Sequence, residues 1–383
     1  MWAKNILVAS CMSYGASQVR CRSRGAFRKS IRVLTQNDAE VDEWQRNTEI
    51  ETPRYVKLGE NDIEFTRTIA ELKDKKRRKQ NRIILEGRRL IGDALESGLQ
   101  VENIYFTLEE HLRGLPLGKV QETQLKKIFF KKMKTWSDLT TCPGIMAVFK
   151  KPTEKELLCT AGPLPLSIVC DNIRDPGNMG AILRTAAAAG CRRLLLMKGC
   201  VDIWESKVLR SGCGAHFRFP IYNNIPWEHL PNYVEQTASV YLADNHSRDA
   251  EIPEQHSEPD VDSNDDEDVQ ETTYTMKTED GSIVKVDKLY LDPDELKAAH
   301  SYKLQCKEYT EVAYNQKDSV LVIGSEAQGL SPQSFLLARN HSGIRVYIPS
   351  ERGVESLNTA VAASILVFEI RRQFAQGSLL RQG

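Results

Sequence analysis

The sequence lacks the features that mark secreted and membrane-spanning proteins. Its 383 residues include nine cysteines, an odd number, and no two of them form a C-x-x-C pair. This pattern argues against a disulfide framework and against a structural zinc site, so we expect reduced thiols and no metal. The longest largely apolar stretch runs from Thr359 to Phe368, ten residues, which is too short to span a bilayer. We therefore expect no membrane association.

Acidic residues are missing from the N-terminal segment. Residues 1–37 contain no aspartate or glutamate, although the formal net charge of the whole chain is zero. They carry seven basic residues: Lys4, Arg20, Arg22, Arg24, Arg28, Lys29 and Arg32. An acid-free, arginine-rich segment with serine and alanine between the charges is typical of a mitochondrial transit peptide. We expect these residues to direct the protein to the mitochondrial matrix; a basic tail without a targeting role is the alternative.

Two other segments carry charge of mainly one sign. The segment from Glu71 to Arg82 has seven basic residues and two acidic ones. It suits either a solvated surface or contacts with nucleic-acid phosphates. The segment from Asp249 to Asp280 has thirteen acidic residues and one lysine. This composition predicts a disordered loop that projects away from any nucleic-acid site.

The chain divides into segments of different pattern. After a polar, poorly periodic stretch at 38–65, residues 66–151 alternate helical and strand patterns, and Gly162, Pro163 and Pro165 predict a linker at 152–166. Residues 167–383 alternate strands with helices, apart from an acidic insertion at about 247–315. This alternation predicts an α/β fold with a parallel sheet between helices. Ligands in such folds bind at the carboxyl ends of the strands.

The first polar cluster is "DNIRDPGNMGAILRTA", residues 171–186. The Asp-Pro-Gly sequence at 175–177 predicts a turn, and we expect Asn178 to cap the following helix and leave N–H groups free for an anion. Arg184 lies in a stretch of otherwise small and apolar residues. The other positions of this helix look buried on several faces, so we expect the guanidinium to need a phosphate or carboxylate partner. A surface arginine is the alternative.

The second cluster is "VLVIGSEAQGLS", residues 320–331. Gly324 and Gly329 have the spacing of a P-loop, but Leu330 stands where the lysine belongs, so a nucleoside triphosphatase is disfavoured. No G-x-G-x-x-G follows a predicted strand, so a Rossmann dinucleotide site is unsupported. What remains is a glycine-lined turn with one carboxylate, Glu326. It suits a neutral or cationic ligand whose adenine and ribose pack on exposed backbone, or it is a plain strand–helix turn.

The third cluster lies between a strand and the last helix. The strand ends at Ile348 and Pro349, and a helix with a small-residue stripe is expected from Ser356, followed by Leu357 and Asn358. Serine is a good N-cap, which gives a structural explanation. The alternative is a binding site at the point where the strand passes into the helix.

Together, in this order, the three clusters resemble the motifs of the SpoU/TrmH family of RNA ribose 2′-O-methyltransferases, in the SPOUT superfamily. The motifs are "NIRDPGNMGAILRTA", "LVIGSEAQGL" and "VYIPSERGVESLNTAVAASILVFE". The resemblance implies a trefoil-knotted SPOUT parallel sheet with helices on both faces. It also implies a preceding small L30e-like substrate-binding domain, which "RIILEGRRLIGDALESGLQVENIYFT" resembles, and a homodimer in which the C-terminal helices pack together. The acidic insertion departs from the family pattern but lies outside the three motifs.

The resemblance also implies roles for individual residues. S-adenosylmethionine would be held in the knot, largely by backbone, at Gly324, Gly329, Leu330, Ile348 and Leu357. The catalytic groups would be Asn178, Arg184, Glu326, Ser356 and Asn358. The family assigns activation of the ribose hydroxyl to the arginine that matches Arg184. Because a guanidinium stays protonated, we instead expect it to clamp a phosphate and stabilise the developing alkoxide charge.

The expected reaction transfers a methyl group to a ribose 2′-oxygen, with guanosine as the expected nucleotide, in mitochondrial large-subunit rRNA. It needs neither a metal nor a covalent enzyme intermediate. One alternative is a tRNA ribose methyltransferase of the same fold. Another is a non-catalytic RNA-binding ribosome assembly factor, which the presence of all five polar residues disfavours.

Overall fold

The computed structural model describes most of the chain after residue 52. The described residues are 53–73, 81–157, 162–244, 273–277, 283–287, 296, 298, 299, 302–314, 318–351 and 356–380. Arg54–Gly383 form one compact unit, to which all of the following applies. The predicted transit peptide, the centre of the basic segment and most of the acidic segment lie outside the described residues.

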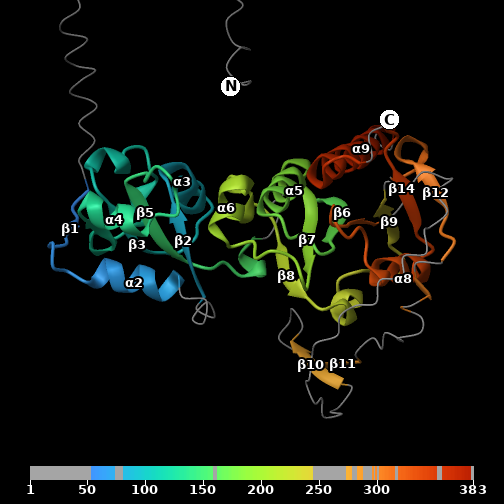
Figure 1. Ribbon diagram of the computed structural model, residues 1–383, viewed down its shortest axis with the longest axis horizontal. Helices are drawn as coiled ribbons and strands as arrows, with labels where there is room; N and C mark the ends of the chain where they lie inside the picture. The colour runs from blue at the N-terminus through green and yellow to red at the C-terminus, as the bar shows by residue number, and fades with distance from the viewer. Residues whose placement is uncertain are drawn as a thin grey trace, which may run out of the picture. The chain divides into compact units, whose positions relative to one another are not determined.

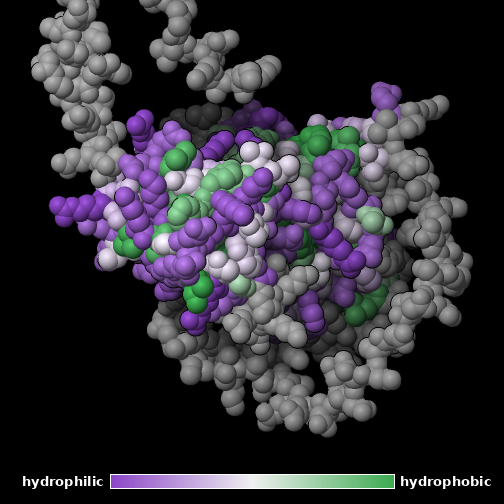
Figure 2. Space-filling view, turned by 60° about the vertical axis from the view of Figure 1, so that its left-hand side comes forward, coloured by the Kyte–Doolittle hydropathy of each residue, from purple (hydrophilic) through white to green (hydrophobic). Residues whose placement is uncertain are grey.

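The first part of this unit is a five-stranded sheet in the order β1-β4-β3-β5-β2. Strands β1, β4 and β3 are parallel, and β5 runs antiparallel to its neighbours β3 and β2. Helices α2 and α4 pack on one face and α3 on the other. Hydrophilic residues surround small groups of hydrophobic ones on the face that Figure 2 shows. The elements are β1 Val56–Lys57, α2 Glu64–Lys73, β2 Arg82–Glu86, α3 Arg88–Glu96, β3 Val101–Phe106, β4 Leu125–Lys127, α4 Phe130–Trp136 and β5 Ile145–Lys150.

The second part contains a seven-stranded sheet in the order β12-β14-β9-β13-β6-β7-β8, in which every pair is parallel. Helices α5 and α9 cover one face and α8 the other (Figure 1). This confirms the predicted parallel sheet with helices on both faces. The elements are β6 Leu164–Cys170, α5 Pro176–Ala189, β7 Cys191–Met197, α6 Ser206–Gly212, β8 Ile221–Ile225, β9 Ser239–Ala243, β12 Cys306–Glu308, β13 Ser319–Ile323, α8 Pro332–Asn340, β14 Ile344–Tyr347 and α9 Thr359–Leu380.

The central strands are buried on both faces because their side chains alternate between two cores. In β13, Leu321 and Ile323 join the core beneath α5 and α9, whereas Val320 and Val322 join the core beneath α8. A nearly continuous apolar run is the pattern that a doubly covered parallel strand requires.

Four strands between residues 167 and 383 were not predicted from the sequence. β8 extends one edge of the large sheet, and β12 extends the other although it lies inside the insertion expected at 247–315. β10 (Thr273–Lys277) and β11 (Ile283–Asp287) form an antiparallel pair. β10 falls within the segment that was predicted to be disordered, so that prediction is wrong for these residues.

Two helix starts also differ from the sequence prediction. Asn178 does not cap α5, because Asp175 has the extended N-cap conformation and its Oδ1 accepts a hydrogen bond from the Asn178 N–H at 2.7 Å. Pro176 then occupies the first helical position, where its missing N–H costs nothing. Helix α9 begins at Thr359 rather than at Ser356, and Asn358 Oδ1 accepts from the Ala360 N–H at 3.1 Å.

The strand order brings the three sequence motifs to one edge of the sheet. β13 lies between β9 and β6, and β14 pairs with the far side of β9. The chain after β14 must therefore return across the carboxyl ends of β9 and β13 before α9 packs against α5. The knot that the resemblance implies stays a prediction.

Candidate functional site

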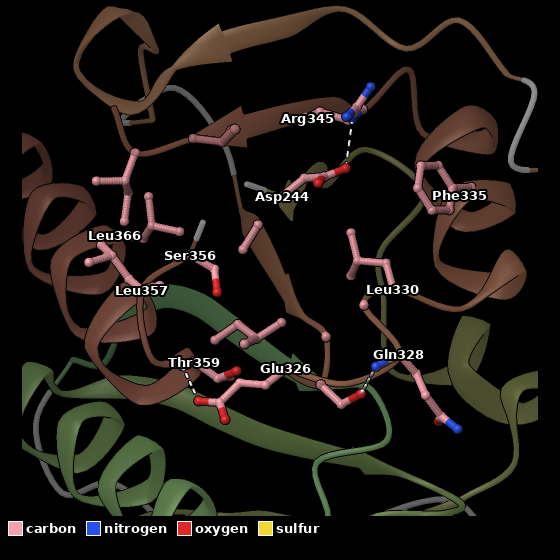
Figure 3. A pocket seen from close by; sticks show the side chains of 18 of the residues that line it. Asp244, Glu326, Gln328, Leu330, Phe335, Arg345, Ser356, Leu357, Thr359 and Leu366 are labelled. Atoms are coloured by element: carbon pink, nitrogen blue, oxygen red, sulfur yellow. Dashed lines mark hydrogen bonds and ion pairs between the residues drawn. The ribbon is translucent and has the colours of Figure 1, made fainter. Parts of the chain in front are cut away.

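A pocket of about 300 Å³ lies at the carboxyl ends of β9, β13 and β14 (Figure 3). All five residues predicted to hold the cofactor line this pocket: Gly324, Gly329, Leu330, Ile348 and Leu357. Two of the predicted catalytic residues, Glu326 and Ser356, also line it. The position agrees with the rule that ligands bind at the carboxyl ends of parallel strands.

The glycine-lined turn after β13 is closed on itself. The Ser325 N–H donates to the Gly329 carbonyl at 3.1 Å, and the Gly329 N–H donates to the Ser325 carbonyl at 2.9 Å. A Cβ on Gly324 would lie 2.4 Å from the Gly329 carbonyl oxygen, so only glycine permits this approach. Gly329 has a φ of 66°, which also favours glycine. The turn therefore brings its backbone close to the pocket, beside the side chains of Glu326 and Gln328.

Apolar side chains face the pocket from two helices. Leu357 and Leu366 lie on the α9 side, and Leu330 and Phe335 lie on the α8 side (Figure 3). Leu330, which occupies the place of the P-loop lysine, is buried. These walls suit a flat, weakly polar ring and exclude a triphosphate.

An ion pair that sequence analysis missed lies on the side of the pocket opposite Glu326 and Thr359 (Figure 3). The Arg345 Nε–H donates to Asp244 Oδ2 at 2.8 Å. Asp244 directly follows β9, so the rule on strand ends could have identified it. Arg345 lies within β14, and only the register between β14 and β9 reveals its position.

Residues from all three motifs form one amide–carboxylate cluster, made of Asn178, Glu326 and Asn358. Glu326 Oε1 accepts from Asn178 Nδ2 at 3.2 Å and from Asn358 Nδ2 at 2.7 Å. It also accepts from the Thr359 N–H at 2.9 Å, and Asn358 Nδ2 donates to Asn178 Oδ1 at 2.8 Å. The carboxylate therefore joins the starts of α5 and α9 to the turn after β13.

A second, smaller cavity of about 200 Å³ borders the same cluster. Glu326 and Thr359 line both cavities, while Asn178 and Arg174 line only the smaller one. The amide–carboxylate cluster thus lies between the two cavities, and each cavity can hold part of a ligand.

Arg184 lies outside the amide–carboxylate cluster. Its side chain is exposed on α5, and Nη1 lies 3.9 Å from Cys213 Sγ. Gly177 and Ala188, seven residues before and four after it, are also exposed, so this side of α5 faces solvent. The expectation of buried surroundings for Arg184 is therefore wrong, and its charge needs no partner within this chain.

Asp171 stabilises the backbone at the start of α8, beside the site, and was not predicted to have a role. It is only 2% exposed, and its Oδ2 accepts from the Ser331 N–H and the Ser334 hydroxyl, both at 2.7 Å. These bonds fix the start of α8 to the end of β6, and so fix the turn between β13 and α8.

The buried thiols of Cys170 and Cys200 are poor nucleophiles. Burial raises the pKa of the Cys200 thiol to about 11 and also raises the pKa of Cys170. Both therefore stay protonated near neutral pH. Within the described residues, no group of three or more His, Cys, Asp or Glu side chains could hold a metal ion, and no helix is long and apolar enough to cross a membrane.

The fold and the site define an α/β protein with a pocket at its strand ends, bordered by a cluster of two amides and one carboxylate. The chain belongs to the SpoU rRNA Methylase family, which matches residues 165–275 and 268–368. It is therefore an RNA methyltransferase, and the family resemblance drawn from the three motifs is confirmed. Residues 64–147 match the MRM3-like substrate binding domain.

Individual relatives agree with this assignment. The chain is 38% identical over 378 residues to "rRNA methyltransferase 3, mitochondrial" of Xenopus laevis, covering 93% of this chain and 88% of the relative. It is 41% identical over 329 residues to the Homo sapiens protein of the same name, covering 84% and 74%. The AdoMet-bound rRNA methyltransferase structure from Sinorhizobium meliloti, 19% identical, has a TM-score of 0.56 and covers 82% of this chain and 97% of its own. At that identity it shows the shared fold.

Proposed function

We propose that the protein transfers the methyl group of S-adenosylmethionine to a ribose 2′-hydroxyl of mitochondrial large-subunit rRNA, with guanosine as the expected nucleotide. The observation that carries the proposal is the amide–carboxylate cluster, in which residues from all three motifs meet at the border of the larger pocket. The relatives named as mitochondrial rRNA methyltransferases and the acid-free residues 1–37 support a location in the mitochondrial matrix.

The residues of the larger pocket fit S-adenosylmethionine. A volume of about 300 Å³ is at the lower end of the range for small-molecule sites. The backbone at Gly324 and Gly329 can receive an adenosine, and the Glu326 carboxylate suits a ligand that carries positive charge, whereas the charge of Asp244 is balanced by Arg345. When bound, S-adenosylmethionine supplies an electrophilic methyl group on its sulfonium.

The chain's polar residues would then position and polarise the ribose. The smaller cavity, lined by Asn178 and Arg174, lies beside the donor pocket and is the proposed place of the target nucleotide. Glu326 and Asn358 hold the amide of Asn178 in a fixed orientation, so its second N–H can direct a hydrogen bond without reorganising. Both N–H groups of Asn358 are already used within the cluster, so Asn358 acts by positioning Asn178. Ser356 is exposed and lines the donor pocket, so its hydroxyl can contact the ribose.

Arg184 is proposed to act on the RNA rather than on the donor. Because its guanidinium is exposed and lies outside the donor pocket, it is free to bind a phosphate of the substrate. There it would also stabilise the negative charge that develops on the attacking oxygen.

This division of roles is tested by three variants of the full chain. We expect Arg184→Ala to lower single-turnover methylation of a large-subunit rRNA fragment by about 10²- to 10³-fold, with unchanged affinity for S-adenosylmethionine. Leu357→Asp should weaken donor binding directly, because it places a carboxylate on an apolar wall of the pocket. Arg184→Lys keeps the charge but loses the planar fork, so it should restore little activity.

Calorimetry of donor binding separates the outcomes. Loss of both donor binding and transfer in Arg184→Ala would contradict the proposed role. A wild-type chain that binds donor and RNA but transfers no methyl group would instead be an RNA-binding assembly factor.

We also propose a homodimer formed through α9. Val361 and Phe368 are 48% and 46% exposed, and their spacing of seven residues places them on one side of the helix. Large apolar side chains at this spacing suit a second helix as a partner.

A further inference from the structure

Three exposed hydrophobic side chains lie at one end of the small five-stranded sheet. Leu108 and Phe129 are each 52% exposed, and Phe130 is 50% exposed. Strands β3 and β4 are parallel, with Phe106 opposite Lys127, so Leu108 and Phe129 each follow their strand by two residues at the same end. We call Leu108, Phe129 and Phe130 the apolar end surface.

The core of this part of the protein does not explain these side chains. The residues beside them, Ile128 and Met133, already fill the core beneath α2 and α4 and are 5% and 0% exposed. Among the described residues, no aromatic ring stacks on Phe129 or Phe130. Two neighbouring rings that remain half exposed indicate a binding surface.

Positive charge borders the apolar end surface. Lys131 and Lys134 are exposed on α4, and Lys134 lies one helical turn after Phe130. Neither lysine has a carboxylate partner among the described residues, whereas the preceding Lys126 and Lys127 are paired with Glu64 and Glu109. The exposed charge on α4, the helix that carries Phe130, is therefore cationic, whereas Leu108 lies near the exposed carboxylate of Glu110.

We propose that the apolar end surface binds unpaired RNA nucleotides, with the rings of Phe129 and Phe130 stacking on bases and Lys131 and Lys134 contacting phosphates. The inference rests on the proposed function, since it assigns a surface to the RNA substrate of the same enzyme. Aromatic side chains next to unpaired cations are the elements with which proteins hold single-stranded RNA. A base-paired helix keeps its bases stacked within the duplex, so the partner is an unpaired segment.

The test distinguishes binding that needs an aromatic ring from binding that needs only an apolar side chain. Affinity of the full chain for a fluorescently labelled, unpaired oligoribonucleotide of mixed sequence is measured for wild type and for Phe129→Ala, Phe129→Leu and Phe129→Trp. Phe130 is varied in the same way. Alanine and leucine should each weaken binding by roughly five- to 150-fold, because both remove the stacking face, and tryptophan should keep the affinity.

Two further measurements complete the test. Lys131→Ala with Lys134→Ala should lower the slope of log affinity against log salt by about 1.4, the value for two contacts to single-stranded phosphate. S-adenosylmethionine affinity should be unchanged in every variant, because these residues do not line the donor pocket. The duplex of the same sequence should bind more weakly than the single strand and respond little to Phe129→Ala.

Each other outcome overturns the inference. Wild-type RNA affinity in the leucine variants would indicate an apolar protein partner, and a change of molecular mass by light scattering in the alanine variants would indicate a self-association surface. Unchanged RNA affinity in the alanine variants would exclude the surface as an RNA site. Failure of the proposed function gives a different result: the wild type would bind RNA through these rings and transfer no methyl group.

Discussion

The amide–carboxylate cluster predicts a specific consequence for Glu326→Ala. One carboxylate oxygen accepts three hydrogen bonds, from Asn178, Asn358 and the Thr359 N–H. The same carboxylate lies at the N-terminus of α9, where negative charge is favourable. Removing it leaves the starts of α5 and α9 without their common acceptor.

The loss of folding free energy expected for Glu326→Ala depends on how exposed the Glu326 carboxylate is. A hydrogen bond to a charged group contributes about 1.5–3 kcal/mol when it is protected from water, but Glu326 is exposed and water can replace part of each bond. We therefore expect a loss of about 2 kcal/mol in total, or a decrease of about 4–8 °C in the unfolding midpoint. Methyl transfer should fall further than donor affinity, because Asn178 and Asn358 lose their orientation.

The assay pairs thermal unfolding with donor calorimetry and single-turnover transfer. Glu96→Ala is the matched control, since Glu96 is an exposed carboxylate at the end of α3, outside the amide–carboxylate cluster, and its loss should leave all three readouts unchanged. Glu326→Gln keeps one acceptor oxygen and should fall between wild type and alanine. An unchanged midpoint together with lost donor binding would refute the reasoning, because the carboxylate would then serve the ligand and not the protein.

Further predictions concern stability, the turn, assembly and targeting. Burial lowers the pKa of His216 to about 4. As the pH falls, this histidine is therefore protonated at a higher pH in the unfolded chain than in the folded chain. Stability should drop by about 2 kcal/mol between about pH 7 and pH 5, and His216→Gln should reduce this slope in thermal unfolding. Gly324→Ala should weaken donor binding in calorimetry, because the added Cβ would meet the Gly329 carbonyl at 2.4 Å; retained affinity would contradict the backbone role of this turn. Phe368→Glu should convert the proposed dimer to a monomer in light scattering, and a dimer that persists would exclude α9 as the interface. Deleting residues 1–37 should keep activity in vitro but abolish import into isolated mitochondria, so import of the shortened chain would disprove the targeting role.

Much of the site could be predicted because strand ends in a parallel sheet meet at one edge. The glycine-lined turn at Gly324 and the segment at Leu357 were each recognisable from sequence, and the sheet brings both to one pocket. The error at Asn178 has a local cause: Asp175 competes for the cap position, and the proline after it is favourable at the first turn of a helix.

Other features depend on contacts between segments that are distant in the sequence, so no local sequence pattern could predict them. Around Arg184 the residues are small and apolar on every side of the helix, so the sequence gives no periodicity that separates exposed from buried positions. The pairing of Asp244 with Arg345 joins residues about one hundred positions apart, through strands whose order no local signal determines. Edge strand β12 has only three residues, which is too few for a recognisable alternation.

The position of β13 between β9 and β6 has a consequence for biosynthesis. While the chain is being made, β6, β7 and β9 emerge first, but β6 and β9 are not neighbours and the place between them stays vacant until β13 has been translated. The glycine-lined turn, Ile348 and Leu357 all follow β13, so a nascent or C-terminally truncated chain contains no donor pocket. Assembly of the sheet must wait for distant segments, which makes folding slow and late. Only a complete chain can therefore bind S-adenosylmethionine. The cofactor can stabilise the complete enzyme, but it cannot stabilise C-terminally truncated fragments.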